Sequence, residues 1–284
     1  YLFTESFAVI ACCEYALAAG DEEALDRARK LYRLVLRYHR VPGLLEPKIN
    51  PQVRPSKSHA MPMILVATSQ ELLRADPDPL YEQIIRECAD EIVSHFVHPE
   101  QHALFETVSP DGALLDGPIG RCINPGHAIE TSWFLMEEAR RSNDNVLLLN
   151  ALQILEWSLD WGWDEEYGGL YSFVDAKGYP PEQLEWDMKL WWPHTEALYA
   201  LLLAHHLTGN KAYATWYERI HEYTWSHFPD PSYGEWYGYL HRDGSVALSL
   251  KGSMWKGPFH VPRALLRCYK LLQEMHDPIK NAEG

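Results

Sequence analysis

The chain has 284 residues, of which 46% are hydrophobic, and it carries a formal net charge of −15 at pH 7. This length suits one large domain or two small ones. The negative charge argues against a nucleic-acid partner and against an anionic membrane surface, because both attract basic faces. No apolar run is long enough to span a membrane and no signal peptide is visible, so we expect a cytoplasmic protein.

The cysteine and histidine spacings do not indicate a metal site. The cysteines are odd in number and fit neither a zinc pattern nor a disulfide framework, which predicts a reduced, intracellular protein. The two histidines of "AHHL" at 204–207 lie within a predicted helix without a carboxylate at ligand spacing, so we interpret them as non-metal residues. The cysteines are Cys12, Cys13, Cys88, Cys122 and Cys268.

Helical periodicity recurs along the whole chain, and strongly apolar segments alternate with amphipathic ones. "TEALYALLLAHH" is an example of the first kind and "DEEALDRARKLYRLVLRYH" of the second. Such an alternation predicts a ring of helical hairpins, with one helix of each pair inside and one outside. The predicted helices are 2–19, 22–40, 59–75, 79–97, 125–141, 145–161, 193–208, 211–227 and 260–275.

An internal repeat connects these helices. Three segments end in the same turn pattern: "HPEQHALFETVSPDG" (98–112), "WDEEYGGLYSFVDAKG" (163–178) and "FPDPSYGEWYGYLHRDG" (228–244). Their closing glycines, Gly112, Gly178 and Gly244, are spaced by 66 residues, and each segment predicts a short hairpin. The repeating unit is therefore helix, turn, helix, hairpin.

A histidine stands near the start of each helix that follows a hairpin. These are His127, His194 and His260, spaced by 67 and 66 residues, with His59 as a weaker fourth example. Inner helices of a ring start at the same end, so these side chains are expected to converge there. A lone histidine in a first turn more often satisfies a helix end. The recurrence favours a functional role for His127 and His260, whereas His194 could simply pack.

Two kinds of chemistry fit the residues at these helix starts. Two opposed histidines can act as general acid and general base, because their unperturbed pKa near 6.5 lets one donate and one accept at neutral pH. Glu130 shares a helix face with His127 and can hold its tautomer. A pair of carboxylates across a cleft would instead suggest glycoside hydrolysis, and Glu130 with Glu196 is the candidate pair.

These motifs together resemble the N-acylglucosamine 2-epimerases, a family related to renin-binding protein. The resemblance covers nearly the whole chain. It implies an all-α fold, an (α/α)6 toroid with short β-hairpins between helical hairpins, and the interconversion of N-acetylglucosamine and N-acetylmannosamine. The matching stretches are "RPSKSHAMPMIL", "INPGHAIETSWF", "WDEEYGGLYSF", "PPEQLEWDMKLWWPHTEAL", "YGEWYGYLHRDG" and "KGSMWKGPFHVPRAL".

The resemblance also implies roles for individual residues. His127 and His260 correspond to two acid/base histidines, which remove the proton at C2 and return one to the opposite face of the sugar. It implies an amino sugar as the small-molecule substrate, no required cofactor and no metal, with ATP as an allosteric activator in several members, and it leaves a homodimer open. The residues implied for substrate binding are Lys48, Glu130, Trp192, Glu196 and Trp255.

The chain is shorter than a full ring of this kind. Six hairpins at about 66 residues each would need on the order of 400 residues. We therefore expect residues 1–284 to be a single barrel domain that lacks about the first three helices, together with a family arginine that contacts the substrate. Two other functions stay open: a barrel glycosidase that uses Glu130 and Glu196, and a non-catalytic, protein-binding relative.

Overall fold

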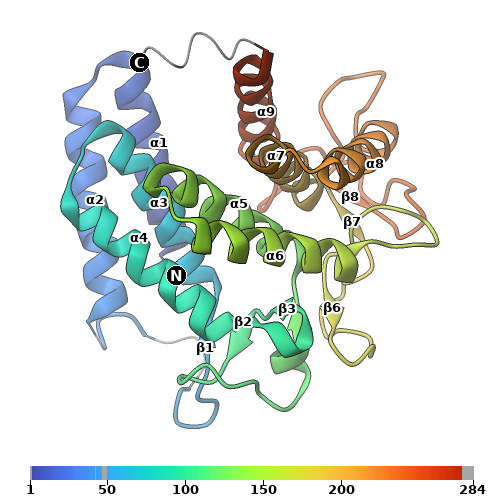
Figure 1. Ribbon diagram of the computed structural model, residues 1–284, viewed down its shortest axis with the longest axis horizontal. Helices are drawn as coiled ribbons and strands as arrows, with labels where there is room; N and C mark the ends of the chain where they lie inside the picture. The colour runs from blue at the N-terminus through green and yellow to red at the C-terminus, as the bar shows by residue number, and fades with distance from the viewer. Residues whose placement is uncertain (1, 42, 47–49, 277–284) are drawn as a thin grey trace. The chain divides into compact units, whose positions relative to one another are not determined.

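The computed structural model describes residues 2–41, 43–46 and 50–276, which fall into two compact units (Figure 1). The first unit ends at Val97 and takes in Glu106–Leu115, and the second comprises His98–Phe105 and the residues from Asp116 onward. Helices dominate both units, as the sequence predicts. The single-domain organisation stays a prediction. No helix among the described residues is long and apolar enough to cross a membrane.

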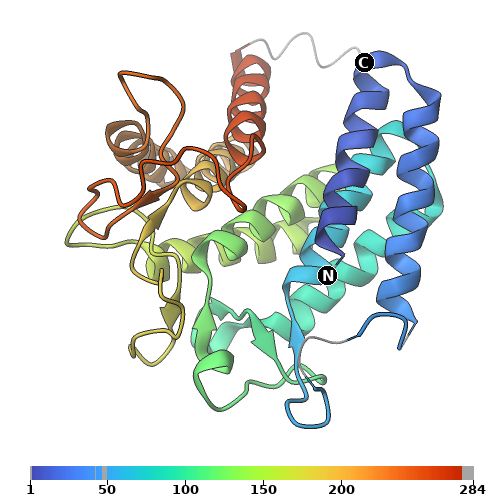
Figure 2. The same cartoon turned by 180° about the vertical axis from the view of Figure 1, so that it is seen from behind.

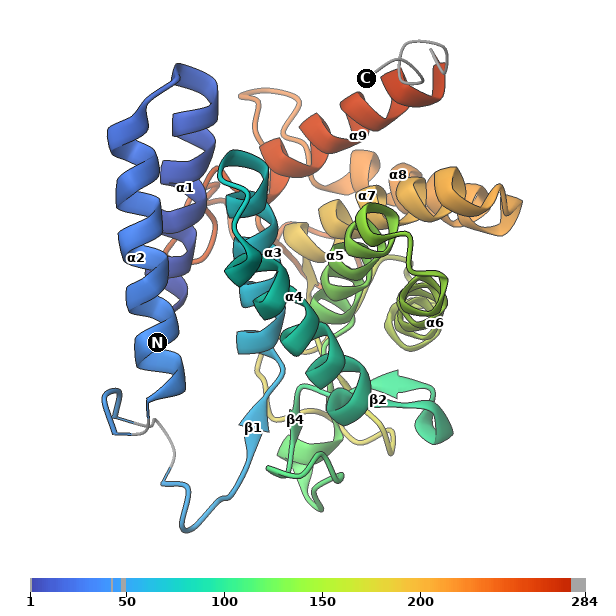
Figure 3. The ribbon, with the colours of Figure 1, turned by 60° about the vertical axis from the view of Figure 1, so that its left-hand side comes forward.

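The first unit consists of two helical hairpins (Figure 3). Helix α1 (Phe3–Ala19) packs on α2 (Glu22–Arg40), and α3 (Ala60–Ala75) packs on α4 (Pro79–Glu91). Side-chain caps start two of them: Asp21 accepts from the Ala24 N–H, and Asp78 accepts from the Leu80 N–H. The predicted helix 79–97 differs in one respect, because its last part, Ile92–Phe96, is a π-helical turn (η1).

The second unit stacks its helices in two layers (Figure 1). Helices α5 (Pro125–Ser142), α7 (Trp191–Thr208) and α9 (His260–His276) form the inner layer, because α7 packs against both of the others. Helix α6 (Asn145–Gly162) covers α5, and α8 (Lys211–His227) covers α7. Every residue of α7 from Pro193 to Ala204 is buried, as expected of an inner helix.

Short antiparallel strand pairs close the helical hairpins. In each pair one strand precedes the first helix of a hairpin and the other follows its second helix, so the two ends of the hairpin are tied together. The pairs are β1 (Lys57–Ser58) with β4 (Thr107–Val108), β5 (Cys122–Ile123) with β6 (Val174–Asp175), and β7 (Lys189–Leu190) with β8 (Tyr239–Leu240). The remaining short elements are β2 (Val97–His98), β3 (Ala103–Leu104), η2 (Pro99–Gln101) and η3 (Pro118–Arg121).

The hairpins of the second unit differ in detail from the prediction. Within 163–178 and 228–244 the local pairing is a single bridge, Trp163 with Leu170 and Pro229 with Trp236. The strands that follow, β6 and β8, pair with the strands before the inner helices (Figure 2). The closing glycines are as predicted, because Gly112, Gly178 and Gly244 have φ values of 90°, 77° and 84°, which glycine adopts without strain.

A buried ion-pair cluster holds the segment that leads into α7. Asp164 Oδ2 accepts from Lys189 Nζ at 2.9 Å and from Arg242 Nε at 2.8 Å, and Lys189 is fully buried. Burial lowers the pKa of Lys189 to about 8, although Asp164 opposes the shift. Burial raises the pKa of Asp164, but Arg242 and Lys189 outweigh it and hold that pKa far below its usual range. The cluster joins the end of α6 to β7 and to the turn after β8.

Candidate active site

His127 is placed by the start of α5. Asn124 Oδ1 accepts from the His127 backbone N–H at 3.0 Å, and Pro125 takes the first helical position, as the sequence predicts. The half-buried imidazole of His127 lies against Trp192 at the start of α7, with the ring centroids 5.2 Å apart. His127 therefore sits where α5 and α7 begin.

His260 lies on the same indole. It is the first residue of α9, and its ring centroid is 5.6 Å from that of Trp192. His127 and His260 thus both flank Trp192, and the structure brings together the two histidines that the sequence analysis selected. Residues 133 positions apart in the sequence meet here because α5 and α9 both pack on α7.

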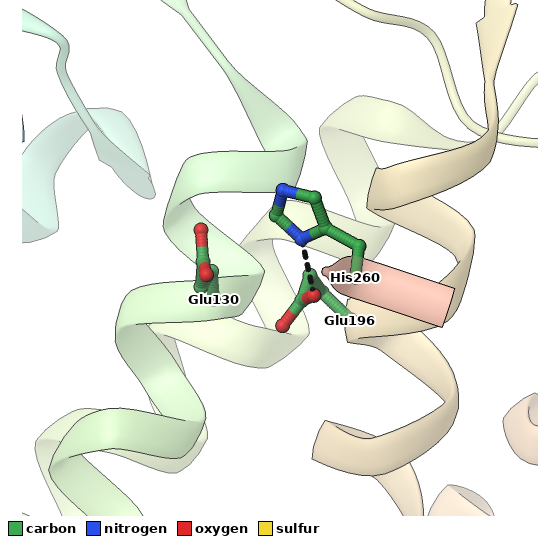
Figure 4. Close-up of side chains that lie close together, drawn as sticks. All are labelled: Glu130, Glu196 and His260. Carbon is green, nitrogen blue, oxygen red and sulfur yellow. Dashed lines mark hydrogen bonds and ion pairs between the residues drawn. The ribbon is translucent and has the colours of Figure 1, made fainter. Parts of the chain in front are cut away.

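A buried carboxylate holds the His260 ring. Glu196 is 1% exposed, and its Oε1 lies 2.7 Å from His260 Nδ1 while its Oε2 accepts from Trp133 Nε1 at 2.8 Å. Burial raises the pKa of Glu196, but Arg263 and His260 outweigh it and lower that pKa to about 2. An ionised carboxylate can only accept hydrogen bonds, so Nδ1 carries a hydrogen and donates a hydrogen bond to Glu196. The other ring nitrogen, Nε2, points away from Glu196 (Figure 4).

Arg263 joins the two acidic residues of the site. Its Nη2 contacts Glu130 Oε1 at 2.5 Å and Glu196 Oε1 at 2.8 Å. Glu130, Glu196 and His260 could group around a cation, since one ligand atom of each lies within 4.8 Å of the others. The Arg263 guanidinium already supplies a positive charge at this point. The arrangement also does not favour a glycosidase, whose two carboxyl groups stand apart on either side of the scissile bond.

His194 is a structural residue, as the alternative interpretation of the sequence had it. It is fully buried, its Nδ1 donates to the Leu190 carbonyl at 2.6 Å, and its Nε2 accepts from the Leu170 N–H at 2.9 Å. Burial lowers the pKa of His194 to about 3. Both ring nitrogens are therefore bonded to backbone, and the ring stays neutral while it stacks on Tyr223.

Other predicted residues lie outside this cluster. Trp255 is 77% exposed and makes no ring contact with the site among the residues described. Two further lysines brace the loop before α9, because Lys251 pairs with Asp230 and Lys256 pairs with Glu235. His59 is buried at the start of α3, in the first unit. Lys48 lies outside the described residues.

Arg263 is the charged residue of this cluster that the sequence analysis missed. It follows Glu196 by 67 positions, and Glu196 follows Glu130 by 66, so the three occupy corresponding places in successive repeats. That period was the signal that could have found it. An arginine on an amphipathic helix usually faces solvent, which hides its role in the sequence.

Gly126, next to His127, is expected to tolerate no side chain. A Cβ there would lie 2.5 Å from Trp192 Cη2 and 2.9 Å from Pro193 Cγ. For Gly126→Ala we expect a net loss in the free energy of unfolding, because overpacking costs about 1–3 kcal/mol and exceeds the gain in helix propensity, about 1 kcal/mol at most. Urea unfolding and near-ultraviolet circular dichroism would measure the loss and the displaced indole.

The matched control is Gly257→Ala, because that position also lies shortly before a site histidine but has no atom within 4 Å of a built Cβ. A Gly126→Ala protein as stable as the wild type, with an unchanged tryptophan spectrum, would contradict the packing described.

The fold and the site define a helical-repeat protein with two histidines and a charged cluster where its inner helices begin. Residues 1–261 match the N-acylglucosamine 2-epimerase (GlcNAc 2-epimerase) family. The chain belongs to this family, as the resemblance of its motifs predicts.

Relatives agree with this assignment, and a solved structure agrees with the fold. The N-acylglucosamine 2-epimerase of Bos taurus is 40% identical over 279 residues, which cover 96% of this chain and 66% of the bovine protein. The Homo sapiens enzyme of the same name is 37% identical over 278 residues, covering 95% of this chain and 64% of the human one. The chain thus spans slightly less than two thirds of the length of these curated relatives. The structure of cellobiose 2-epimerase from Bacillus thermoamylovorans superimposes with a TM-score of 0.80 at 18% identity, over 96% of this chain and 71% of that one, which confirms the predicted fold class.

Proposed function

We propose that the protein is a carbohydrate 2-epimerase that interconverts N-acetylglucosamine and N-acetylmannosamine. The observation that carries the proposal is that two imidazoles, those of His127 and His260, both contact one indole, that of Trp192. Inversion at a carbon needs one group to remove a proton and another to return it. Membership of the N-acylglucosamine 2-epimerase family supports this substrate class.

In the proposed reaction the open-chain sugar presents its C2–H bond next to the C1 carbonyl. One histidine takes the proton, and the electron pair of the C2–H bond passes into the carbonyl to give an enolate. The other histidine then returns a proton to the opposite face of C2. Electrons are neither gained nor lost, so the step balances without a redox cofactor. His260 acts through Nε2, because its Nδ1 proton is bound by Glu196.

The proposed substrate contacts have different support. Trp192 contacts both histidines, and an aromatic ring is a surface on which a sugar can stack. Glu130 and Glu196 both contact Arg263, and Glu196 also contacts His260. Their contact with the substrate stays a prediction, as do the roles of Lys48 and Trp255. Activation by ATP, assembly as a homodimer and a cytoplasmic location also stay predictions.

Incubation of the full-length protein with N-acetylmannosamine in deuterated water tests the proposal. We expect N-acetylglucosamine with deuterium at C2, because the proton is lost to a histidine that exchanges with solvent. Mass spectrometry and the disappearance of the C2–H signal in the proton NMR spectrum would measure it. The same assay with and without ATP tests activation.

Two other results would contradict the proposal. Release of reducing sugar from a glycoside without exchange at C2 would indicate a hydrolase that uses Glu130 and Glu196. Neither exchange nor hydrolysis across a panel of amino sugars and neutral sugars would indicate a non-catalytic relative.

A further inference from the structure

We propose that Arg263 is a positioning residue that offsets part of the negative charge of Glu130 and Glu196 and thereby favours the neutral His260 imidazole, with Nε2 available as a base. The proposal rests on the proposed epimerase function. Arg263 lies one helical turn after His260 on α9, so the two side chains project from the same face of one helix. Its guanidinium reaches acidic residues on two other helices, Glu130 on α5 and Glu196 on α7.

The position of the guanidinium is fixed by packing as well as by charge. Its central carbon lies 4.4 Å from the ring centroid of Phe259 and 5.1 Å from that of Trp133, and the side chain is only 16% exposed. Aromatic faces on two sides attract the cation and restrict its rotation. Trp133 also donates its N–H to Glu196, so the same indole fixes both the arginine and the carboxylate.

The charges that face His260 come from three helices. Glu130 on α5 and Glu196 on α7 are negative, and Arg263 on α9 is positive. His127 on α5 is a further titratable ring on the same Trp192 indole, while the indoles of Trp191 and Trp192 are uncharged. Both carboxylates are buried, at 7% and 1% exposure. Without the guanidinium, the two carboxylates favour a protonated His260, because Glu196 contacts its ring directly. A protonated imidazole has no lone pair at Nε2 and cannot remove a proton.

The geometry at one atom shows how the neutral form is held. Glu196 Oε1 lies 2.7 Å from His260 Nδ1 and 2.8 Å from Arg263 Nη2. Arg263 Nη2 is also 3.5 Å from His260 Nδ1, and both nitrogens donate to the shared Glu196 oxygen. If His260 took up a further proton, the positive charge of the imidazolium would therefore lie beside that of the guanidinium. Arg263 therefore permits the Nδ1–H to bind Glu196 while it opposes a further proton on the ring.

The test compares Arg263→Gln and Arg263→Lys with wild type in the full-length protein, by two readouts. The first is nitrogen-15 NMR of histidine-labelled protein, with His260→Asn to assign the signal, and it does not depend on activity. At pH 7 we expect a larger fraction of His260 to be protonated at both nitrogens in Arg263→Gln than in wild type. The second readout is steady-state kinetics, in which kcat should fall by about 10²-fold with a much smaller change in KM.

Arg263→Lys separates charge from geometry. A single ammonium keeps the positive charge but cannot reproduce the fork of the guanidinium between two carboxylates. We expect an intermediate kcat and a mixed His260 signal. If Arg263→Gln does not fold, Arg263→Met takes its place, because methionine keeps an apolar stem without the charge, and a wild-type His260 signal and kcat in that variant would overturn the proposal.

Arg267→Gln is the matched structural control. Arg267 lies one turn further along α9. Its guanidinium carbon is 4.7 Å from the ring centroid of Trp133, the indole that Arg263 also contacts, and Arg267 Nη1 is 3.5 Å from Glu137 Oε1. Its loss should lower stability while the His260 signal and kcat stay near wild type. If Arg263→Gln behaves in the same way as Arg267→Gln, Arg263 has only a structural role and the proposal is wrong. If wild type itself shows no C2 exchange, the proposed function fails, whereas the NMR comparison still tests the role of Arg263.

Discussion

Replacement of His260 by asparagine is expected to lower epimerisation turnover by roughly 10²–10⁴-fold, because the amide can still donate to Glu196 but cannot take up the C2 proton. His127→Asn should have an effect of the same size, since it removes the group that serves the other face of C2. Turnover in the full-length protein, measured by coupled assay or NMR in both directions, gives the comparison. Each variant is also expected to exchange the C2 proton of the one substrate that its remaining base can reach.

The control for both histidine variants is His194→Asn. His194 is bonded to backbone through both ring nitrogens and does not face the site, so its loss should reduce stability much more than turnover. Near-normal epimerisation by His127→Asn or His260→Asn in a folded protein would show that the residue only satisfies a helix end.

Replacement of Asp164 by alanine is expected to lower the free energy of unfolding by about 3–5 kcal/mol, because it leaves Lys189 fully buried without its carboxylate. Urea unfolding at pH 7 measures the change. Glu166→Ala is the matched control: Glu166 contacts the same Arg242 at 3.1 Å but is 62% exposed, so its loss should cost about 1 kcal/mol or less. Equal losses in the free energy of unfolding in Asp164→Ala and Glu166→Ala would show that burial does not determine how much each carboxylate contributes to stability.

The same cluster predicts how stability depends on pH. Arg242 and Lys189 hold the pKa of Asp164 below its value in the unfolded chain, which is about 3.9. A carboxyl group with a lowered folded pKa contributes stability above the unfolded pKa, and this contribution is lost as pH falls below about 4. Wild type should therefore lose more stability than Asp164→Ala between pH 5 and pH 3. Parallel pH curves for the two proteins would show that this ion cluster contributes no net stability.

The helix boundaries were predictable where a local signal marks them. Asp21, Asp78 and Asn124 cap their helices through side-chain hydrogen bonds, and each is visible in the sequence as a polar residue before a periodic segment. Helix α7 begins at Trp191, two residues before the predicted start, because no side-chain cap separates it from the strand that precedes it. The π-helical turn at the end of α4 has no local sequence signal and depends on packing.

The candidate site was predictable in its members but not in its pairings. The repeat period identified His127 and His260 as neighbours, and the helix face identified Glu130. The partner of His260 is Glu196, which is 64 residues away in the sequence and was predicted only to bind substrate. Such pairings depend on which inner helices touch, and a chain of helices with equal spacing does not specify that. Arg263 was missed for the same reason, since both of its carboxylate partners lie on other helices.

The corresponding places of Glu130, Glu196 and Arg263 in successive repeats limit how alike those repeats can be. Three carboxylates at this point would repel one another, and so would three guanidiniums, whereas two acids and one arginine attract. The chain can therefore keep its internal symmetry in backbone and packing, but the symmetry must be broken at this one position. Exchange of one repeat for another would preserve the helices but change the charges at this position. The repeats are therefore equivalent in backbone and packing, whereas each supplies a charged residue that the others cannot replace.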